Sequence, residues 1–125
     1  MIAADSSTWV AFIEGESGND VRLLDEALSD QQVLMAPAVL SELLSDPKLP
    51  ANIEKILLGL PLIEVEEGYW QRVGVLRAKL LGKKKRARLG DALIAQSCID
   101  RGVALVTRDR DFQAFAEGAG LELLR

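Results

Sequence analysis

The sequence predicts a three-layer α/β/α domain with a central parallel sheet, formed by residues 1–125 as a single unit. Its apolar runs are continuous rather than alternating, which is typical of strands buried on both faces of a parallel sheet. Segments with helical periodicity separate these runs, as in α/β folds. The candidate strands are residues 1–4, 33–36, 60–65, 103–106 and 121–124. Pro61 restricts the third of these to a strand start or an edge.

The first half of the chain carries capping signals for four helices. Ser6 or Ser7 can cap a helix over residues 6–13 that ends at Gly15, and residues 19–28 follow with an amphipathic pattern. Pro37 suits a first helical turn, and the helix that it opens stops at the Asp46-Pro47 step. A fourth helix is expected over residues 50–59.

The second half of the chain predicts three further helices. The longest runs from about residue 66 to Gly82 and carries Trp70 at the edge of its apolar stripe, where we expect partial burial or, alternatively, a place facing a partner protein. Residues 91–101 follow, and Gly102 is suited to a C-cap. A short helix over residues 111–117 precedes the last strand.

Composition narrows the possible chemistry. The chain has no histidine and one cysteine, Cys98, so the Ser-His-Asp, Cys-His and HExxH arrangements are excluded. A single cysteine forms no disulfide framework, and no apolar stretch reaches the roughly 18 residues of a membrane span. We therefore expect a cytoplasmic protein without a signal peptide, in which carboxylates and a bound metal would carry any hydrolytic activity.

Four acidic residues lie where strands give way to helices or loops. Asp5 follows the first strand, Glu42 lies on the helix after the second, Asp91 opens a helix, and Asp109 follows the fourth strand. Ligands of open parallel sheets bind outside the carboxyl ends of the strands, so these acids can converge there. Crowded carboxylates favour a divalent cation such as Mg²⁺, and that combination points to phosphodiester hydrolysis. The alternative is that Asp91 caps its helix and Asp109 lies in a polar turn.

A basic run precedes Asp91, although the net charge of the chain is −4. Such a run is either a solvated loop or, beside a metal site, a phosphate-binding patch. Arg108 and Arg110 flank Asp109 and could either face phosphate or pair with acids. The residues of the run are Lys83, Lys84, Lys85, Arg86 and Arg88.

Four segments, in order along the whole chain, resemble the motifs of the PIN domain. They are MIAADSS (residues 1–7), APAVLSEL (36–43), LGDALIA (89–95) and LVTRDRDF (105–112). Each motif alone is weak, whereas four in the correct order are specific. Within that superfamily the compact length is most similar to VapC-type toxins of prokaryotic toxin–antitoxin pairs.

The resemblance implies an endoribonuclease dependent on Mg²⁺ or Mn²⁺, a homodimer, and a cognate VapB-type antitoxin that covers the active-site groove. It implies that Asp5, Asp91 and Asp109 hold metal and that Glu42 is a ligand or a general base. Two hydroxyls and one further acid would support them, and the acid could share or replace the role of Asp109. These supporting residues are Ser6, Thr107 and Asp111.

Two other functional classes are compatible with a domain of this size. One is a catalytically silent PIN-type scaffold that binds RNA or protein. The other is a receiver-like phosphoacceptor, which needs an aspartate after the third strand and a lysine after a late one, where this chain has Glu64 and Thr107-Arg108. For the nuclease, transfer, ribosomal and messenger RNA all remain open as substrates, as does the number of metal ions.

Overall fold

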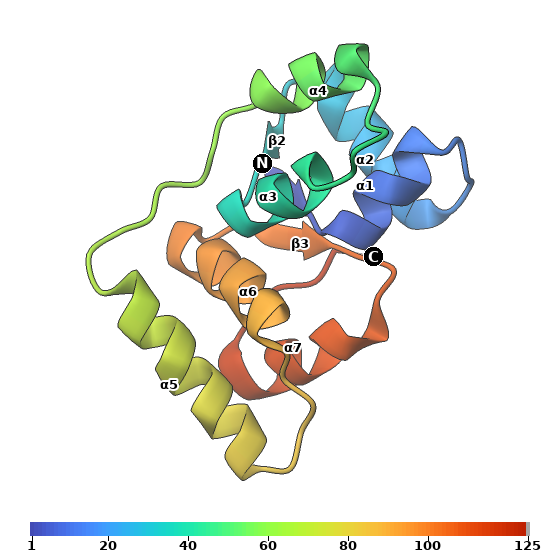
Figure 1. Cartoon of the computed structure of the whole chain (residues 1–125). Coiled ribbons are helices and arrows are strands. Elements are labelled where there is room, and N and C mark those ends of the chain that lie inside the picture. Colours follow the sequence, from blue (N-terminus) through green and yellow to red (C-terminus); the bar gives the residue numbers. More distant parts are fainter. Residues whose placement is uncertain (125) are drawn as a thin grey trace.

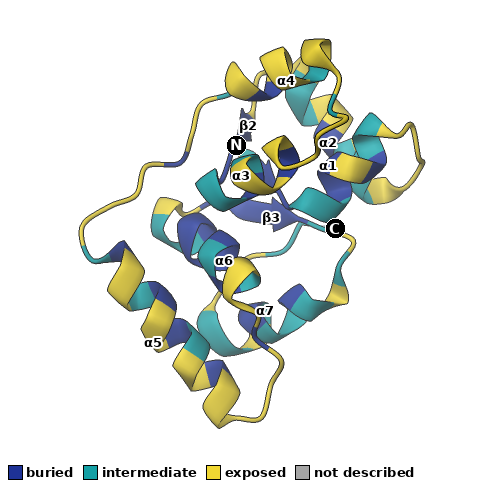
Figure 2. Ribbon diagram, in the orientation of Figure 1, coloured by how far each residue is buried: buried dark blue, intermediate teal, exposed yellow. Residues whose placement is uncertain are grey.

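The computed structural model describes residues 1–124 and contains a parallel sheet with strand order β2-β1-β3. In β1 (Ile2–Ala4), Ile2 pairs with Val33 of β2 (Val33–Leu34) and with Ala104 of β3 (Ala104–Val106). Most of the strand residues are buried (Figure 2), as their continuous apolar character predicts. The predicted α/β class is therefore confirmed, with three of the five expected strands in the sheet.

The two other expected strands, residues 60–65 and 121–124, are single parallel bridges. Leu62 bridges Met35 and Leu123 bridges Leu105, one on each side of the sheet. The backbone N–H and C=O groups of successive residues point to opposite edges of a strand, so in the three-residue β3 only the middle residue, Leu105, directs both groups away from β1. Leu105 N accordingly donates to Glu122 O, and Leu105 O accepts from Leu124 N.

Helices cover both faces of the sheet (Figure 1). The first four are α1 (Ser6–Ile13), α2 (Asn19–Ser29), α3 (Pro37–Leu44) and α4 (Ala51–Leu58). The last three are α5 (Tyr69–Gly82), α6 (Leu89–Arg101) and α7 (Gln113–Ala119), with a 3₁₀ turn, η1, at Arg110–Phe112. Figure 1 shows α3 and α6 in front of the sheet and α2 behind it, with α5 outermost against α6. No helix in the described residues is long and apolar enough to cross a bilayer.

Three helix starts differ from the sequence expectation. Asp5, rather than Ser6 or Ser7, caps α1, because its carboxylate accepts from Thr8 N at 3.2 Å. Helix α6 begins at Leu89, which places Asp91 inside the first turn instead of at the cap. Helix α5 begins only at Tyr69, because Gly68 adopts a left-handed conformation at φ +82°. The first two shifts move carboxylates that matter for the site.

Candidate metal centre

Three carboxylates meet beside the carboxyl edge of β1 and β3. Asp91 projects from the first turn of α6, while Asp109 and Asp111 come from the turn that follows β3. One carboxylate oxygen from each lies within 4.8 Å of the others, and all three side chains are half-buried. The structure thus brings Asp91 and Asp109 together as the sequence predicted. It also brings in Asp111, so the choice between Asp109 and Asp111 becomes a cluster of both.

Asp5 lies directly behind this cluster, at the end of β1. Its backbone N donates to Val106 O at 3.1 Å, and its side chain is only 4% exposed. Burial raises the pKa of the Asp5 carboxyl, and the negative charge of Asp109 adds to the effect, although hydrogen bonds from Ser7, Thr107 and Thr8 N oppose it. Asp5 therefore belongs to the same electrostatic group as the three clustered acids.

Asp91 is the most perturbed of these acids. Its pKa is raised to about 6, first by burial and then by the charge of Asp109, with smaller effects of Asp111 and Asp5. Arg88 opposes the shift. Without a cation, Asp91 therefore keeps its proton to a higher pH than an ordinary aspartate does and is half protonated at about pH 6. A divalent cation would remove the repulsion that keeps the proton bound.

Hydroxyl and amide groups fix the orientation of the carboxylates. Asp109 N donates to Thr107 Oγ1 at 2.9 Å, and Asp111 N donates to Asp109 Oδ1 at 2.9 Å. Ser7 Oγ lies 2.8 and 3.0 Å from the two oxygens of Asp5 and donates to that carboxylate. Thr107 thus has the supporting position that the sequence predicted, between Asp5 and Asp109.

The serine beside Asp5 is a correction to the sequence expectation. Ser7, not Ser6, bonds to the carboxylate, because Asp5 caps α1 and the second residue of the helix faces back toward it. Ser6 Oγ is instead buried without a hydrogen-bond partner among the described residues. Ser6 lines a groove together with Glu42.

Glu42 lies at the margin of the site rather than in its centre. It is exposed on α3, one turn after Pro37, and is not part of the carboxylate cluster found among residues 1–124. It lines one hollow with Ser6 and a second with Gly90, the neighbours of Asp5 and Asp91. Glu42 therefore lies near the residues next to Asp5 and Asp91, outside the carboxylate cluster.

The donor set fits a hard divalent cation. Every candidate ligand atom is an oxygen: the carboxylates of Asp91, Asp109 and Asp111 and the buried carboxylate of Asp5. Oxygen-only sites suit Mg²⁺ and Mn²⁺, whereas nitrogen and sulfur ligands select zinc or copper. The raised pKa of Asp91 is consistent with such a site, because burial and the neighbouring acids both disfavour its charged form and a bound cation would offset this.

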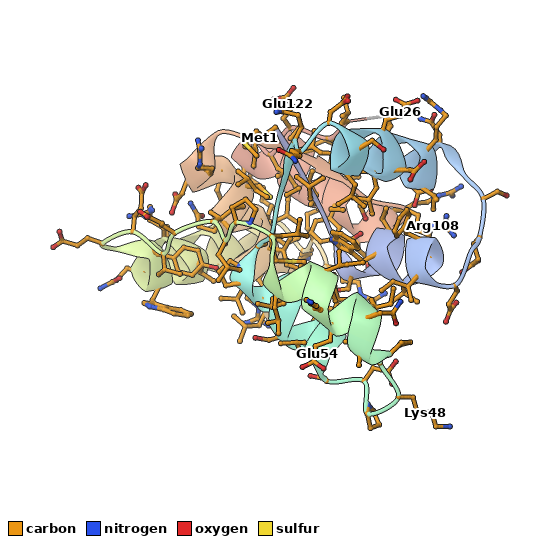
Figure 3. The ribbon with its side chains drawn as sticks, turned by 90° about the horizontal axis from the view of Figure 1, so that it is seen from above. Met1, Glu26, Lys48, Glu54, Arg108 and Glu122 are labelled. Carbon is orange, nitrogen blue, oxygen red and sulfur yellow. The ribbon has the colours of Figure 1, made fainter. Side chains whose placement is uncertain are left out.

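The basic run leads to the acidic cluster along the loop between α5 and α6. All five of its cationic residues, at positions 83–86 and 88, are exposed. Arg86 Nε lies 3.7 Å from Asp111 Oδ2, and Arg88 acts electrostatically on Asp91. Arg108 behaves differently, since it lies beside the loop between α1 and α2 (Figure 3) and pairs with Asp20. The alternatives left open for Arg108 are thereby decided in favour of pairing.

An apolar groove adjoins the site on the side of α5. Trp70 is 66% exposed at its edge, which corrects the expected partial burial. Tyr69 takes the buried position instead and donates its hydroxyl to Leu93 O at 2.6 Å. The helix begins at Tyr69, so the neighbouring tryptophan points outward. The groove contains Pro37, Ala38, Glu42, Trp70, Gly90 and Leu93.

The chain is similar to known proteins in both sequence and structure. The PIN domain family model matches residues 2–118. The VapC ribonuclease Mb1587 of Mycobacterium bovis is 26% identical over 129 residues, covering 98% of this chain and 96% of that protein. Ribonuclease VapC5 of Mycobacterium tuberculosis is 31% identical over 126 residues, covering 91% and 89%.

The fold is also similar to that of solved structures. VapBC2 from Rickettsia felis, crystallised with a DNA fragment from its promoter, gives a TM-score of 0.75 at 23% identity over 99% of this chain and 98% of that one. DNA-bound VapBC from Salmonella typhimurium gives 0.74 at 19% identity, over 99% and 98%. From the match to the family model and the full-length relatives, this chain belongs to the PIN domain family, within which it groups with the VapC proteins.

Proposed function

We propose that this protein is a metal-dependent endoribonuclease that cleaves structured RNA and acts as the toxin of a toxin–antitoxin pair in the cytoplasm. The observation that carries the proposal is the convergence of Asp91, Asp109 and Asp111 with buried Asp5 at the carboxyl edge of the sheet. Relatives across the full length of the chain bear the name ribonuclease. Membership of the PIN family also argues against the alternative that the chain is a receiver-like phosphoacceptor domain.

Asp5, Asp91 and Asp109 would hold Mg²⁺ or Mn²⁺, with Asp111 sharing the site. When bound, such a cation supplies a Lewis acid that activates water and neutralises charge on the phosphoryl oxygens. Ser7 and Thr107 hold the Asp5 carboxylate by hydrogen bonds, and Thr107 Oγ1 also accepts from the backbone N of Asp109. The chain's own acids thus provide the charge and the orientation that hydrolysis needs.

Glu42 would act as the general base that accepts a proton from the attacking water. It is exposed at the margin of the site, and it makes no ion pair within residues 1–124. A carboxylate with this freedom can accept a proton from water that approaches from the solvent side. The water oxygen then bonds to phosphorus, the bond to the leaving ribose oxygen breaks, and that oxygen takes up a proton.

The loop between α5 and α6 would bind the phosphate backbone of the RNA substrate. Lys83, Lys84, Lys85, Arg86 and Arg88 are exposed beside the acids. Contacts of this kind bind the phosphate backbone with little regard for sequence and weaken with salt. Selection of one RNA would then depend on the shape of its loop and on which bases can be unstacked.

A VapB-type antitoxin is the partner that the VapBC complexes among the structural neighbours suggest. The groove beside Trp70 gives such a partner an apolar anchor next to Glu42 and Gly90, where bound protein would block the acids. Exposed apolar side chains on α5, such as Val75, leave additional surface for a homodimer. Antitoxin and second copy would therefore use surfaces close to the site.

Cleavage of total transfer and ribosomal RNA by antitoxin-free protein tests the proposal. Fragments should appear with Mg²⁺ or Mn²⁺, vanish with EDTA, and be absent for Asp91→Asn. Asp25→Asn, on the exposed face of α2, is the matched control and should cleave like wild type. RNA binding without metal-dependent cleavage by either protein would favour the silent scaffold instead.

A further inference from the structure

Arg108 is held in an ion pair on the far side of the strand end that carries Asp109. Its Nε lies 2.8 Å from Asp20 Oδ2 and its Nη2 lies 3.0 Å from Asp20 Oδ1, so the contact is bidentate. Nη2 also donates to Ser17 O at 3.2 Å, and Nη1 lies 3.6 Å from Glu16. A planar guanidinium bound in this way has little freedom to move.

The same Asp20 carboxylate reaches the segment that carries Asp5. Thr8 Oγ1 donates to Asp20 Oδ2 at 2.9 Å, and Thr8 is completely buried. The backbone N of Thr8 in turn donates to Asp5 Oδ1 at 3.2 Å. One carboxylate from α2 therefore ties together the ends of β1 and β3, which carry Asp5 and Asp109.

The backbone around Asp20 is adapted to this contact. Gly18 has φ +151°, and a Cβ there would lie 2.6 Å from Asp20 Oδ1 and 3.0 Å from Arg108 Nη2. Any other residue would push the carboxylate or the guanidinium out of place. The side chain of Asp20 is 12% exposed, and the Arg108 hydrogen bond lowers its pKa, so the pair is charged and partly shielded from solvent.

A second bidentate pair in the protein shows what a purely structural role looks like. Arg72 Nε and Nη2 lie 3.1 and 2.6 Å from Asp100, whose side chain is 11% exposed. That pair joins α5 to α6 and touches none of the four site acids. It resembles the Asp20–Arg108 pair in geometry and burial, but it lies elsewhere in the fold.

We infer that Asp20 is a positioning residue, which sets the spacing of the Asp5 and Asp109 carboxylates through Thr8 and Arg108 and thereby sets the affinity of the site for a divalent cation. The inference rests on the proposed metal site. Groups that orient ligands in this indirect way change metal affinity by about 10- to 100-fold when they are removed.

The test is the Kd for Mn²⁺ of the purified full chain, measured by electron paramagnetic resonance of free Mn²⁺. Asp20→Ala should weaken binding by about tenfold or more. Thr8→Val, which removes one hydroxyl at nearly constant volume, and Arg108→Gln should each give part of that loss and add nothing in the Asp20→Ala background. Asp100→Asn, the matched control, should lower the melting temperature and leave the Kd within twofold of wild type.

Two results would overturn the inference. One is a Kd for Asp20→Ala within twofold of wild type; the other is a loss as large for Asp100→Asn. If Asp20→Ala fails to fold, Thr8→Val and Arg108→Gln decide by the same criteria.

A readout without metal separates this inference from the proposed function. In amide and carboxyl NMR spectra of metal-free protein, Asp20→Ala should shift the resonances of both Asp5 and Asp109, because Thr8 and Arg108 lose their common partner, whereas Asp100→Asn should leave both in place. Resonances of Asp5 and Asp109 that do not change in Asp20→Ala would refute the positioning role. Wild-type protein that binds no Mn²⁺ would contradict the metal site itself, and the NMR result would still decide the role of Asp20.

Discussion

Replacing Asp91 by asparagine should stabilise the metal-free protein at neutral pH, although it removes an acid needed for activity. The pKa of Asp91 is raised from 3.8 to about 6, because burial and the neighbouring acids disfavour its charged form. A carboxyl whose pKa is higher in the folded state stabilises the fold fully below pH 3.8. That contribution is lost as the pH rises through about 6. At pH 8 the ionised Asp91 therefore destabilises the folded protein, whereas an uncharged amide of the same size does not.

The size of the effect follows from the shift. A change from 3.8 to about 6 corresponds to about 3 kcal/mol at pH 8. Asp91 is only half-buried, so solvent screening reduces this to about 1–2 kcal/mol. In a domain of this length such a gain raises the melting temperature by about 3–10 °C.

The assay is thermal or urea unfolding in EDTA between pH 4.5 and pH 8. The free energy of unfolding of Asp91→Asn should exceed that of wild type at pH 8, and the difference should shrink steadily below pH 6. Asp25→Asn, at an exposed position, is the control for the substitution itself. An Asp91→Asn protein that is less stable than wild type at pH 8, or a difference that does not depend on pH, would refute the electrostatic reasoning.

Three further outcomes are expected. Mn²⁺ should raise the melting temperature of wild type more at pH 7.5 than at pH 5.5, because bound metal displaces the proton from Asp91; a shift independent of pH would contradict this. Changing Lys83, Lys84 and Lys85 to alanine in the Asp91→Asn background should make the plot of log binding constant against log salt concentration less steep by about 2 for single-stranded RNA. An unchanged slope would show that RNA does not bind at this loop. Trp70→Ala should leave the melting temperature and the cleavage rate unchanged but weaken antitoxin binding by about 2 kcal/mol. The binding is measured by calorimetry with Val75→Ala as the comparison, and equal affinities of the two variants would show that the antitoxin does not bind in the groove beside Trp70.

Much of the architecture was readable from the sequence because it depends on local signals. Continuous apolar runs at residues 1–4, 33–36 and 103–106 identified the three paired strands. The rule that parallel strands end at one edge predicts that Asp5, Glu42, Asp91 and Asp109 converge; Asp5, Asp91 and Asp109 do, whereas Glu42 lies outside the cluster. Burial pattern and strand polarity were sufficient for both.

What the sequence missed depends on contacts between distant segments or on a shift of one residue. Ser7 replaced Ser6 because the helix cap falls on Asp5, which changes which hydroxyl faces the carboxylate. Asp20 went unnoticed because its partner Arg108 lies 88 residues away and no local pattern links them. Trp70 was expected at a partly buried position, and a late helix start turned it to the surface.

The most direct test of the account is the chemistry of the cleaved ends. RNA cut by wild-type protein in Mn²⁺ and ¹⁸O-labelled water should be analysed by mass spectrometry, alongside the Asp91→Asn variant. Attack by water predicts linear monophosphate ends that carry one ¹⁸O atom, formed only with metal and only by wild type. Cyclic 2′,3′-phosphate ends without label, or fragments that persist in EDTA, would contradict a carboxylate-held metal site as the origin of the activity.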